Sequence, residues 1–349
     1  MTSQSPKPIL TFCVAIYNVS KYLGECLDSL LSIKDQDIEF IMVNDGSTDN
    51  SLTICEKYLE ADKRFRLSIH TENKSLIQAR KTGIELARGK YLCFLDGDDK
   101  VESKNITQLI SSLKNTENDI VQFGVSCFGE EQFIPQNFNV KFKLKTEKND
   151  LSIKQVRFEV FHTHSISWQV FNKVYKTNLL RRCLPALENV SFTSGEDAYL
   201  TFILTHLAQS YSSLDVPIYR YRIGTGISNG AETIEKFSVH VRDISIPRLL
   251  NTKLSTSIQI PFDLLLLTQL EKALKELTVL RFWRLPLLDK KKGYQLMKDE
   301  GIKIGDLLKF SIQIFIKFSS RVFFPVGSKR RTTMKKILIK CQRDHLRSK

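Results

Sequence analysis

The 349-residue sequence lacks several motifs that would assign it to a common class of protein. No G-x-G-x-x-G follows the first apolar stretch and no G-x-x-x-x-G-K-[ST] occurs, which argues against a dinucleotide-dependent oxidoreductase and a P-loop NTPase. No uninterrupted apolar run is long enough to cross a bilayer. Residues 1–8 are polar and lack the apolar core of a signal peptide, so we expect a cytoplasmic protein.

Cysteine is present, but without any spacing that indicates a cross-link or a metal site. The seven cysteines are scattered, none occurs in a C-x-x-C pair, and most lie within apolar stretches. Buried reduced thiols are therefore expected rather than disulfides or zinc ligands. His162 and His164 form the only close histidine pair, and no third ligand at a recognisable spacing accompanies them, which disfavours a metal site there.

The first half of the chain alternates apolar stretches with segments of helical periodicity. Strands are predicted over residues 9–16, 39–43, 66–69, 91–95 and 120–126, and helices over 20–31, 50–60 and 76–87, with Ser20 as the N-cap of the first. Strands that alternate with helices of this length predict an α/β fold with a mainly parallel sheet flanked by helices.

The apolar run from Tyr91 to Leu95 leads directly into Asp96-Gly97-Asp98-Asp99. Such a run predicts a strand that is buried on both faces, and ligands of open α/β sheets bind outside the carboxyl ends of the strands. Mg²⁺ and Mn²⁺ usually take one or two protein carboxylates and fill their remaining positions with water and phosphate oxygens. The sequence therefore predicts a metal-diphosphate site at Asp96 and Asp98, with an acidic helix-capping turn as the alternative.

Two further polar residues are placed near the same edge of the predicted sheet. Asp45 follows the second strand, where its carboxylate could accept hydrogen bonds from a nucleobase or ribose, although its sequence context is also that of an ordinary turn. Arg80 lies on the helix before the acidic strand and could offer its guanidinium to a diphosphate or a base. The alternative for Arg80 is a solvated helical charge.

These residues belong to blocks that resemble the successive signatures of the family 2 glycosyltransferases of GT-A fold, in the family's order. The blocks are Val14 to Asn18, Val43 to Asp49, Ala79 to Ile84, Gly89 to Tyr91, Phe94 to Asp99, Asn172 to Lys176, Gly195 to Asp197, and Tyr219 to Arg222 with Ile227-Ser228. The resemblance covers residues 9 to about 230. It implies a catalytic domain over 1–230, with a donor half at 9–126 and an acceptor half at 127–230, followed by a helical region at 231–349.

The resemblance also implies a role for individual residues. Tyr17, with Asn18 beside it, and Asp45 would hold the base of a nucleotide-sugar, and Arg80 would approach the nucleotide. Asp96 and Asp98 would bind ribose and Mn²⁺ or Mg²⁺. Asp197 would be the general base that activates the acceptor hydroxyl, with Glu196 as the competing candidate.

The sequence departs from the family pattern at a few positions. Ala15 stands where the family often has proline, Asn44 replaces the first acid of D-D-G-S, and Ser75 and Ile77 replace a glycine and a serine. These departures bear on which donor the protein would select more than on the type of reaction.

On the acceptor side, the candidate residues are Trp168, Lys173, Glu196 and Arg222. Trp168, at the start of a predicted strand, could stack on an acceptor sugar or pack in the core. Lys173 could bind phosphate or serve as a structural cation. Residues 128–149, rich in Phe, Asn, Gln and Lys, are interpreted as a hairpin or an excursion over the acceptor side.

The C-terminal region is helical and strongly basic at its end. A helix with one apolar face is predicted over residues 261–283, and residues 306–324 combine a broad apolar side with a narrow polar stripe. From residue 303 onward there are 13 basic and 2 acidic side chains, so most of the formal net charge of +14 lies there. Residues 329–349 contain no aromatic residue, which disfavours nucleic acid. We expect attachment to an anionic membrane surface, with a packed helix and a solvated tail as the alternative.

Together these features predict a metal-dependent, inverting glycosyltransferase on the inner face of the cell membrane. By resemblance it would transfer a sugar from a UDP-sugar to a hydroxyl of a cell-surface glycan or lipid-linked glycan, in a capsule or lipopolysaccharide type of pathway. A nucleotidyl- or phosphoalcohol-transferase on a similar fold would also use D-x-D and metal. A non-catalytic glycan- or nucleic-acid-binding protein is the third alternative.

Overall fold

The computed structural model describes residues 7–129, 151–192, 195–224 and 232–302, together with residues 305, 307 and 311. The chain separates into two compact units: unit 1 comprises residues 1–230 and 246–270, and unit 2 comprises residues 231–245 and 271–349. The predicted excursion beyond residue 129 and most of the amphipathic segment 306–324 lie outside the described residues.

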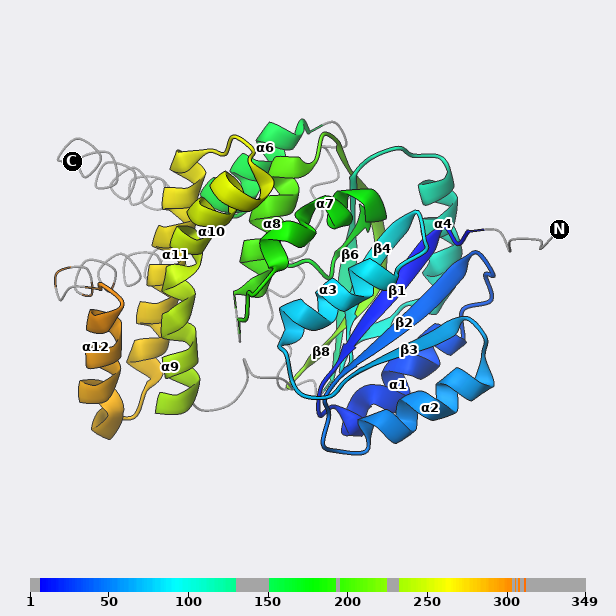
Figure 1. Cartoon of the computed structure of the whole chain (residues 1–349), viewed down its shortest axis with the longest axis horizontal. Helices are drawn as coiled ribbons and strands as arrows, with labels where there is room; N and C mark the ends of the chain where they lie inside the picture. The colour runs from blue at the N-terminus through cyan, green and yellow to red at the C-terminus, as the bar shows by residue number, and fades with distance from the viewer. Residues whose placement is uncertain are drawn as a thin grey trace, which may run out of the picture. The chain divides into compact units, whose positions relative to one another are not determined.

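The described part of unit 1 is built on an eight-stranded sheet in the order β3-β2-β1-β4-β7-β6-β8-β5 (Figure 1). The strands are β1 (Leu10–Ile16), β2 (Ile38–Asp45), β3 (Phe65–His70), β4 (Tyr91–Asp96), β5 (Lys100–Val101), β6 (Ile120–Gly129), β7 (Lys173–Lys176) and β8 (Tyr211–Ile223). Strands β1 to β4 pair in parallel, as do β6 and β8, whereas β7 runs antiparallel to both of its neighbours and β5 antiparallel to β8. The expected α/β fold with a mainly parallel sheet is confirmed.

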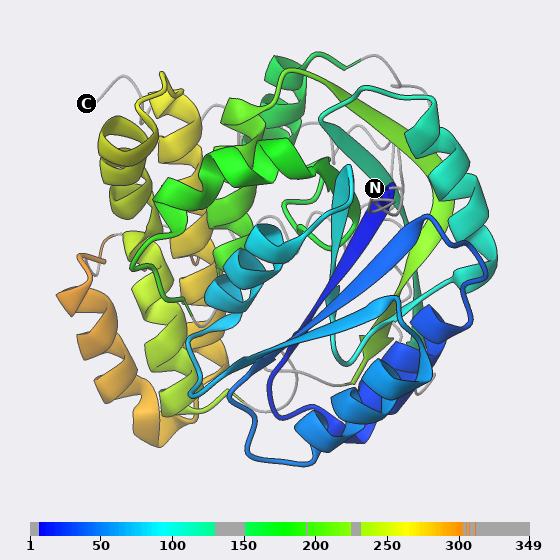
Figure 2. The ribbon, with the colours of Figure 1, turned by 45° about the vertical axis from the view of Figure 1, so that its right-hand side comes forward.

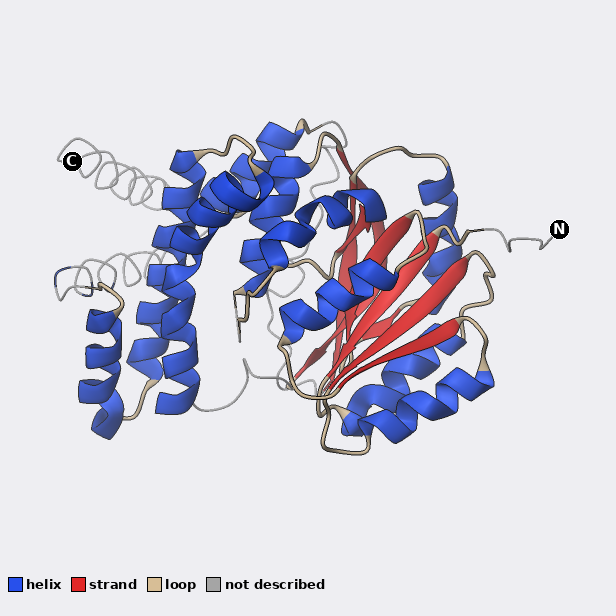
Figure 3. Cartoon of the chain, in the orientation of Figure 1, coloured by secondary structure: helices blue, strands red, loops and turns tan. Residues whose placement is uncertain are grey.

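Helices cover both faces of this sheet (Figure 3). Those of unit 1 are α1 (Ser20–Leu31), α2 (Ser51–Ala61), α3 (Leu76–Leu86), α4 (Ile106–Lys114), α6 (Ile153–Phe158), α7 (Thr177–Leu187), α8 (Glu196–Leu207), α10 (Ile246–Lys253) and the start of α11 (Leu264–Arg284), with the short 3₁₀ helix η1 (Ser103–Asn105) and the short π-helices η3 (Glu159–Thr163) and η5 (Leu254–Ile258). Helix α3 packs on β1 and β2 and beside α7 (Figure 2).

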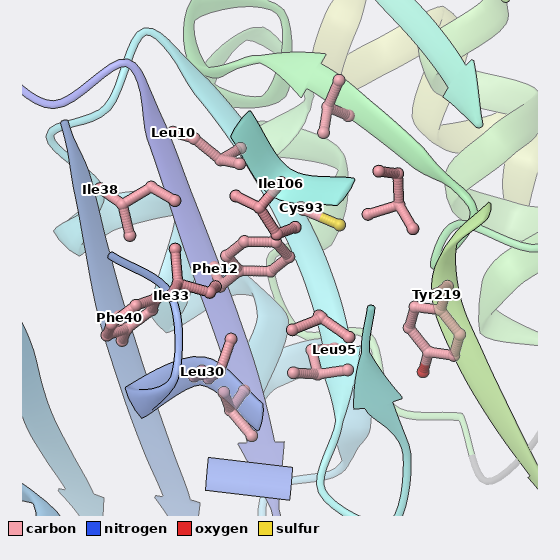
Figure 4. Packing of buried hydrophobic residues seen from close by; sticks show 14 of the residues in the cluster. Leu10, Phe12, Leu30, Ile33, Ile38, Phe40, Cys93, Leu95, Ile106 and Tyr219 are labelled. Atoms are coloured by element: carbon pink, nitrogen blue, oxygen red, sulfur yellow. The ribbon is translucent and has the colours of Figure 1, made fainter. Parts of the chain in front are cut away.

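The core of unit 1 follows from the alternation of side chains along its strands. Leu10 and Phe12 of β1 point to the same face, where Leu30 of α1 and Ile106 of α4 pack against them (Figure 4). Both faces of β1 and β4 are buried, which explains why these strands read as continuous apolar runs in the sequence.

Two details of the sequence interpretation are wrong. Ser20 is the first residue of α1 rather than its cap, and its backbone N–H donates to Asp49 Oδ2 at 2.9 Å, so the next loop supplies the acceptor that the helix start requires. Trp168 does not begin a strand, because β7 starts at Lys173.

All elements in the described part of unit 2 are helices. It contains α9 (Ile234–Arg242), η4 (Asp243–Ser245), the part of α11 (Leu264–Arg284) after Leu270, η6 (Leu287–Asp289) and α12 (Lys290–Asp299). Its core includes Phe237, Val279, Phe282 and Met297. None of the helices in the described ranges has the length and apolar character needed to span a bilayer.

Candidate active site

The aspartates after β4 form a tight turn that is built around a glycine. The backbone N–H of Asp99 donates to the carbonyl of Asp96 at 3.0 Å and closes the turn. A Cβ on Gly97 would lie 2.9 Å from Val19 Cγ2, so a larger residue would push the turn away from the start of α1. The glycine of D-G-D-D thus permits Asp96 and Asp98 to sit close to the loop that carries Tyr17.

Strand β8 holds this turn from the other side. Tyr219 Oη donates to Asp99 Oδ2 at 2.6 Å and accepts from the backbone N–H of Asp96 at 3.3 Å. The backbone N–H of Arg222 donates to Asp99 Oδ1 at 2.6 Å, and its Nε donates to the carbonyl of Asp98 at 2.7 Å. Asp99 is 2% exposed and both of its carboxylate oxygens accept hydrogen bonds, so its role is structural. Asp96 and Asp98 remain partly exposed.

Arg222 lies in an aromatic cradle behind the aspartate turn. Its guanidinium carbon is 4.7 Å from the ring centroid of Tyr22 and 4.4 Å from that of Phe128, and Nη2 is 3.2 Å from Glu25 Oε2. Lys100 also contacts Glu25, and hydrogen bonds from Lys100 and Arg222 lower the pKa of that carboxyl. This setting makes Arg222 a support of the aspartate turn, and its role toward an acceptor stays a prediction.

Arg80 of α3 is a buried cation surrounded by carboxylates from two other elements. Its Nη1 lies 2.8 Å from Asp197 Oδ1 and 3.6 Å from Glu196 Oε1, and its Nη2 lies 3.3 Å from Asp96 Oδ1. The arginine is 1% exposed, so it is not the solvated helical charge that the sequence left open. Asp96 ends β4 and the other two carboxylates begin α8, where the helix dipole favours negative charge.

Burial and like charge keep two of these carboxyls easier to protonate than usual. Burial raises the pKa of Asp96 to about 6 against the opposing effect of Arg80, with Asp98 and Asp197 adding to the rise. Burial raises the pKa of Glu196 to about 8, and the negative charge of the adjacent Asp197 contributes to the rise. The site thus holds acidic groups with pKa values near neutrality, which is typical of sites that transfer protons.

Asp45, at the end of β2, is engaged by the chain itself. It is 2% exposed and accepts hydrogen bonds from the backbone N–H groups of Lys74 and Ser75, each at 3.0 Å. His70 Nδ1 lies 2.6 Å from Asp45 Oδ1, and His70 Nε2 lies 2.9 Å from Thr82 Oγ1. These contacts fix the loop before α3, and the base-binding role of Asp45 stays a prediction.

The loop after β1 carries Tyr17 and Asn18 and lies beside the loop after β2. Tyr17 is 46% exposed at the end of β1, which leaves its ring available to a ligand. Asn18 has φ +50° and its Oδ1 accepts from the backbone N–H of Thr48 at 2.8 Å, which ties the two loops together. Asn18 therefore positions the loop that carries Tyr17.

The acceptor candidates differ in their surroundings. Trp168 is half-buried, its carbonyl accepts from Thr201 Oγ1 at 2.6 Å, and its ring meets that of His164 edge-on. Lys173 is 2% exposed, and its Nζ donates to the carbonyls of Ser167 and Gln169 at 2.9 and 2.7 Å. Lys173 thus organises the segment before β7, and its role toward an acceptor stays a prediction.

Sequence reasoning did not assign Asp99, Tyr219 and His70. His70 ends β3 as Asp45 ends β2, so the rule that marked polar residues at strand ends could have found it. Tyr219 offered no such signal, because its partner Asp99 lies 120 positions away. Among the residues that the structure describes, no group of three or more His, Cys, Asp or Glu side chains gathers as a metal site. Asp96 and Asp98 still suit Mg²⁺ or Mn²⁺ if a bound diphosphate supplies further oxygens.

The chain is similar to known glycosyltransferases in sequence and in fold. The sequence model of the family described as "Glycosyl transferase family 2" matches residues 11–182. Over 218 residues the chain is 33% identical to the uncharacterized glycosyltransferase EpsJ of Bacillus subtilis. This alignment covers 62% of this chain and 61% of EpsJ. Over 227 residues it is 30% identical to the minor teichoic acid biosynthesis protein GgaB of the same organism, covering 62% of this chain and 23% of GgaB.

The alignments thus span less than two thirds of the length of these relatives. Among solved structures, S. aureus TarS 1-349 in complex with UDP aligns with a TM-score of 0.53 at 17% identity, covering 86% of this chain and 80% of TarS. That similarity shows a shared fold. From its ordered motifs, its sheet and the match of the family model, the region at residues 11–182 belongs to the family 2 glycosyltransferases and has their GT-A fold.

Proposed function

We propose that this protein is a metal-dependent, inverting glycosyltransferase that moves a sugar from a UDP-sugar to a hydroxyl of a cell-surface glycan. The observation that carries the proposal is the cluster in which Asp96, Glu196 and Asp197 surround the buried Arg80 at the carboxyl end of β4. The UDP complex of TarS supports the choice of nucleotide, and the name of GgaB supports a cell-envelope polymer as the acceptor.

The donor would be held at the edge of the sheet where β1, β2 and β4 end. Tyr17 and Asp45 would contact the base, and Asp96 and Asp98 would hold Mn²⁺ or Mg²⁺ together with oxygens of the diphosphate. Bound there, the metal would neutralise charge on the departing diphosphate. Tyr219 and Arg222 would support this binding, because their contacts with Asp99 hold the turn in place.

The transfer would be a single displacement. The acceptor hydroxyl oxygen forms a bond to the anomeric carbon as the bond from that carbon to the diphosphate breaks, and UDP leaves with the electron pair. Asp197 accepts the hydroxyl proton, and its hydrogen bond to Arg80 orients the carboxylate. Glu196, whose pKa is raised to about 8 by burial, would remain largely protonated at pH 7 and assist by shaping the site.

The acceptor would be a growing glycan or lipid-linked glycan at the inner face of the membrane. The basic residues after position 303 would attach the enzyme to that surface by attraction to anionic lipids. Replacing Lys335, Lys336 and Lys340 by Gln tests this part, because binding to anionic vesicles at low salt should weaken.

The experiment that tests the reaction is a screen of the full chain against nucleotide-sugars with Mn²⁺ or with EDTA. Release of UDP that requires metal, with transfer of sugar to water or acceptor, is the expected result. Release of a nucleoside monophosphate would point instead to a nucleotidyl- or phosphoalcohol-transferase. Binding without turnover across the panel would favour a non-catalytic binding protein.

A further inference from the structure

The turn between α11 and α12 exposes its apolar side chains to an unusual degree. Leu287 and Leu288 are 88% and 95% exposed, more than any other large apolar side chain in the described part of the chain. Trp283, at the end of α11, is 55% exposed. Single exposed leucines are common on protein surfaces, but an adjacent pair with a neighbouring tryptophan forms an apolar tip.

The packing of unit 2 imposes this exposure. Leu285 is 4% exposed in the core, and a Cβ on Gly293 would lie 2.6 Å from Leu285 Cδ1, so α12 packs closely on the start of the turn. The backbone N–H of Asp289 donates to the carbonyl of Pro286 at 3.0 Å and closes the turn. With both ends fixed, Leu287 and Leu288 cannot enter the core without breaking it.

Cations flank the apolar tip on both sides. Arg284 precedes it and Lys291 and Lys292 follow it, and all three side chains are exposed. Lys290 lies over the rings of Phe282 and Trp283, with its Nζ 4.6 and 5.1 Å from their centroids. Among residues 283–292, Asp289 is the single acidic side chain.

We propose that this turn is a membrane contact, in which Leu287 and Leu288 insert into the headgroup region of an anionic lipid surface. The apolar tip supplies the buried area, the flanking cations match anionic lipid headgroups, and tryptophan favours the boundary between water and acyl chains. A protein groove for the same leucines would have to present acidic groups to Arg284, Lys291 and Lys292. The contact is distinct from the basic tail and does not depend on the proposed reaction.

Vesicle sedimentation with the full chain tests the proposal. Vesicles of phosphatidylcholine with phosphatidylserine should bind the wild type, and Leu287→Ser/Leu288→Ser should lower the partition coefficient about tenfold or more without changing the net charge. The matched control is Leu264→Ser/Leu265→Ser, an adjacent pair on α11 that is 65% and 50% exposed. The control should bind as the wild type does, and all variants retain the tail.

A second measurement reports where the turn lies. The chain has two tryptophans, so Trp168→Phe leaves Trp283 as the sole one, and its fluorescence should be quenched by lipids brominated on the acyl chains. Absence of quenching, unchanged binding of the Leu287/Leu288 variant, or equal loss in the control would overturn the proposal. So would a shift from dimer to monomer caused by the Leu287/Leu288 substitutions without vesicles, because the turn would then cover a second copy of the chain.

Discussion

Arg80 and Asp197 are 117 positions apart in the chain, yet Arg80 Nη1 lies 2.8 Å from Asp197 Oδ1. The other terminal nitrogen of the same guanidinium lies 3.3 Å from Asp96 Oδ1. The residue proposed as general base and a residue proposed to bind metal are thus joined through one buried cation. The fold therefore fixes the distance between Asp197 and Asp96. A displacement reaction requires such fixed positions for the group that activates the acceptor and the group that holds the departing diphosphate.

Removing this cation should destabilise the fold. Arg80→Met leaves Asp197, Glu196 and Asp96 without their buried partner and should cost about 3–5 kcal/mol in the free energy of unfolding. Arg80→Met/Asp197→Asn should recover part of that loss, because one of the uncompensated charges is gone. Denaturant unfolding measures both, with Arg248→Met, an exposed arginine of α10, expected within about 0.5 kcal/mol of wild type. A loss for Arg80→Met no larger than that of this control would contradict the electrostatic account.

Metal binding at Asp96 and Asp98 should require nucleotide. Two carboxylates alone are a weak Mg²⁺ or Mn²⁺ site, so Mn²⁺ should raise UDP affinity about tenfold or more in titration calorimetry. Asp98→Asn should abolish that increase, whereas Asp215→Asn, an exposed aspartate of β8, should keep it. Equal UDP affinity with Mn²⁺ and with EDTA in the wild type would rule out the assignment.

The general base should be Asp197 rather than Glu196. Asp197→Asn should lower transfer about 10²- to 10⁴-fold while leaving UDP affinity with Mn²⁺ within a few-fold, because the base contacts the acceptor and not the nucleotide. Glu196→Gln should be mild at pH 7, since burial raises the pKa of Glu196 to about 8 and glutamine resembles the protonated acid. The reverse pattern, an active Asp197→Asn and an inactive Glu196→Gln, would exchange the two roles.

Replacing Ser75 by glycine should stabilise the protein. Its φ of +96° and ψ of 155° lie in a region that only glycine adopts readily, and the strain is of order 1–3 kcal/mol. Ser75→Gly should therefore raise the free energy of unfolding by about 1 kcal/mol, after the added freedom of glycine in the unfolded chain is subtracted. Ser111→Gly, in the regular backbone of α4, should lower it by about 0.5–1 kcal/mol. Changes of the same sign at both positions would refute the strain argument.

His206 should make the fold sensitive to acid. Its Nδ1 lies 2.7 Å from the carbonyl of Phe202 and its Nε2 accepts from the backbone N–H of Asp263 at 3.3 Å, an arrangement that requires the neutral ring. Burial lowers the pKa of His206 from 6.5 to about 4.

As the pH falls below about 6.5 the unfolded chain takes up this proton first, so the free energy of unfolding should decrease by about 1–3 kcal/mol before pH reaches 4. The loss should be smaller in His206→Gln, whose amide can donate and accept in the same place. Parallel curves for the two proteins between pH 6.5 and 4 would exclude His206 as the cause.

The sequence predicted those parts of the fold that depend on local pattern. The apolar run from Tyr91 to Leu95 and the helical periodicity of the segments around it predicted the alternation of β1 to β4 with α1 to α3. Such patterns depend only on residues that are close together in the sequence. The placement of Asp96 and Asp98 at the carboxyl end of β4 followed from the same pattern.

The contacts that complete the site could not be read in this way, because they join distant segments. An arginine on a helix is usually solvated, and the burial of Arg80 arises only when α8 brings its carboxylates against α3. Likewise, nothing near Lys173 announces that β7 inserts antiparallel between β4 and β6. The backbone N–H of Ser75, a residue with positive φ, likewise donates to a residue 30 positions away, Asp45.

The support that β8 gives to the aspartate turn has a consequence during synthesis of the protein. Strands β1 to β4 can pair as soon as they leave the ribosome, but Asp99 obtains the Tyr219 hydroxyl and the Arg222 N–H only after a further 120 or so residues have been added. Until then the buried Asp99 carboxylate has no partner from β8, and a nascent chain that ends before Tyr211 would carry the aspartates without a fixed turn. Nucleotide binding by chains of increasing length should therefore appear when β8 is completed and not when the D-G-D-D segment emerges.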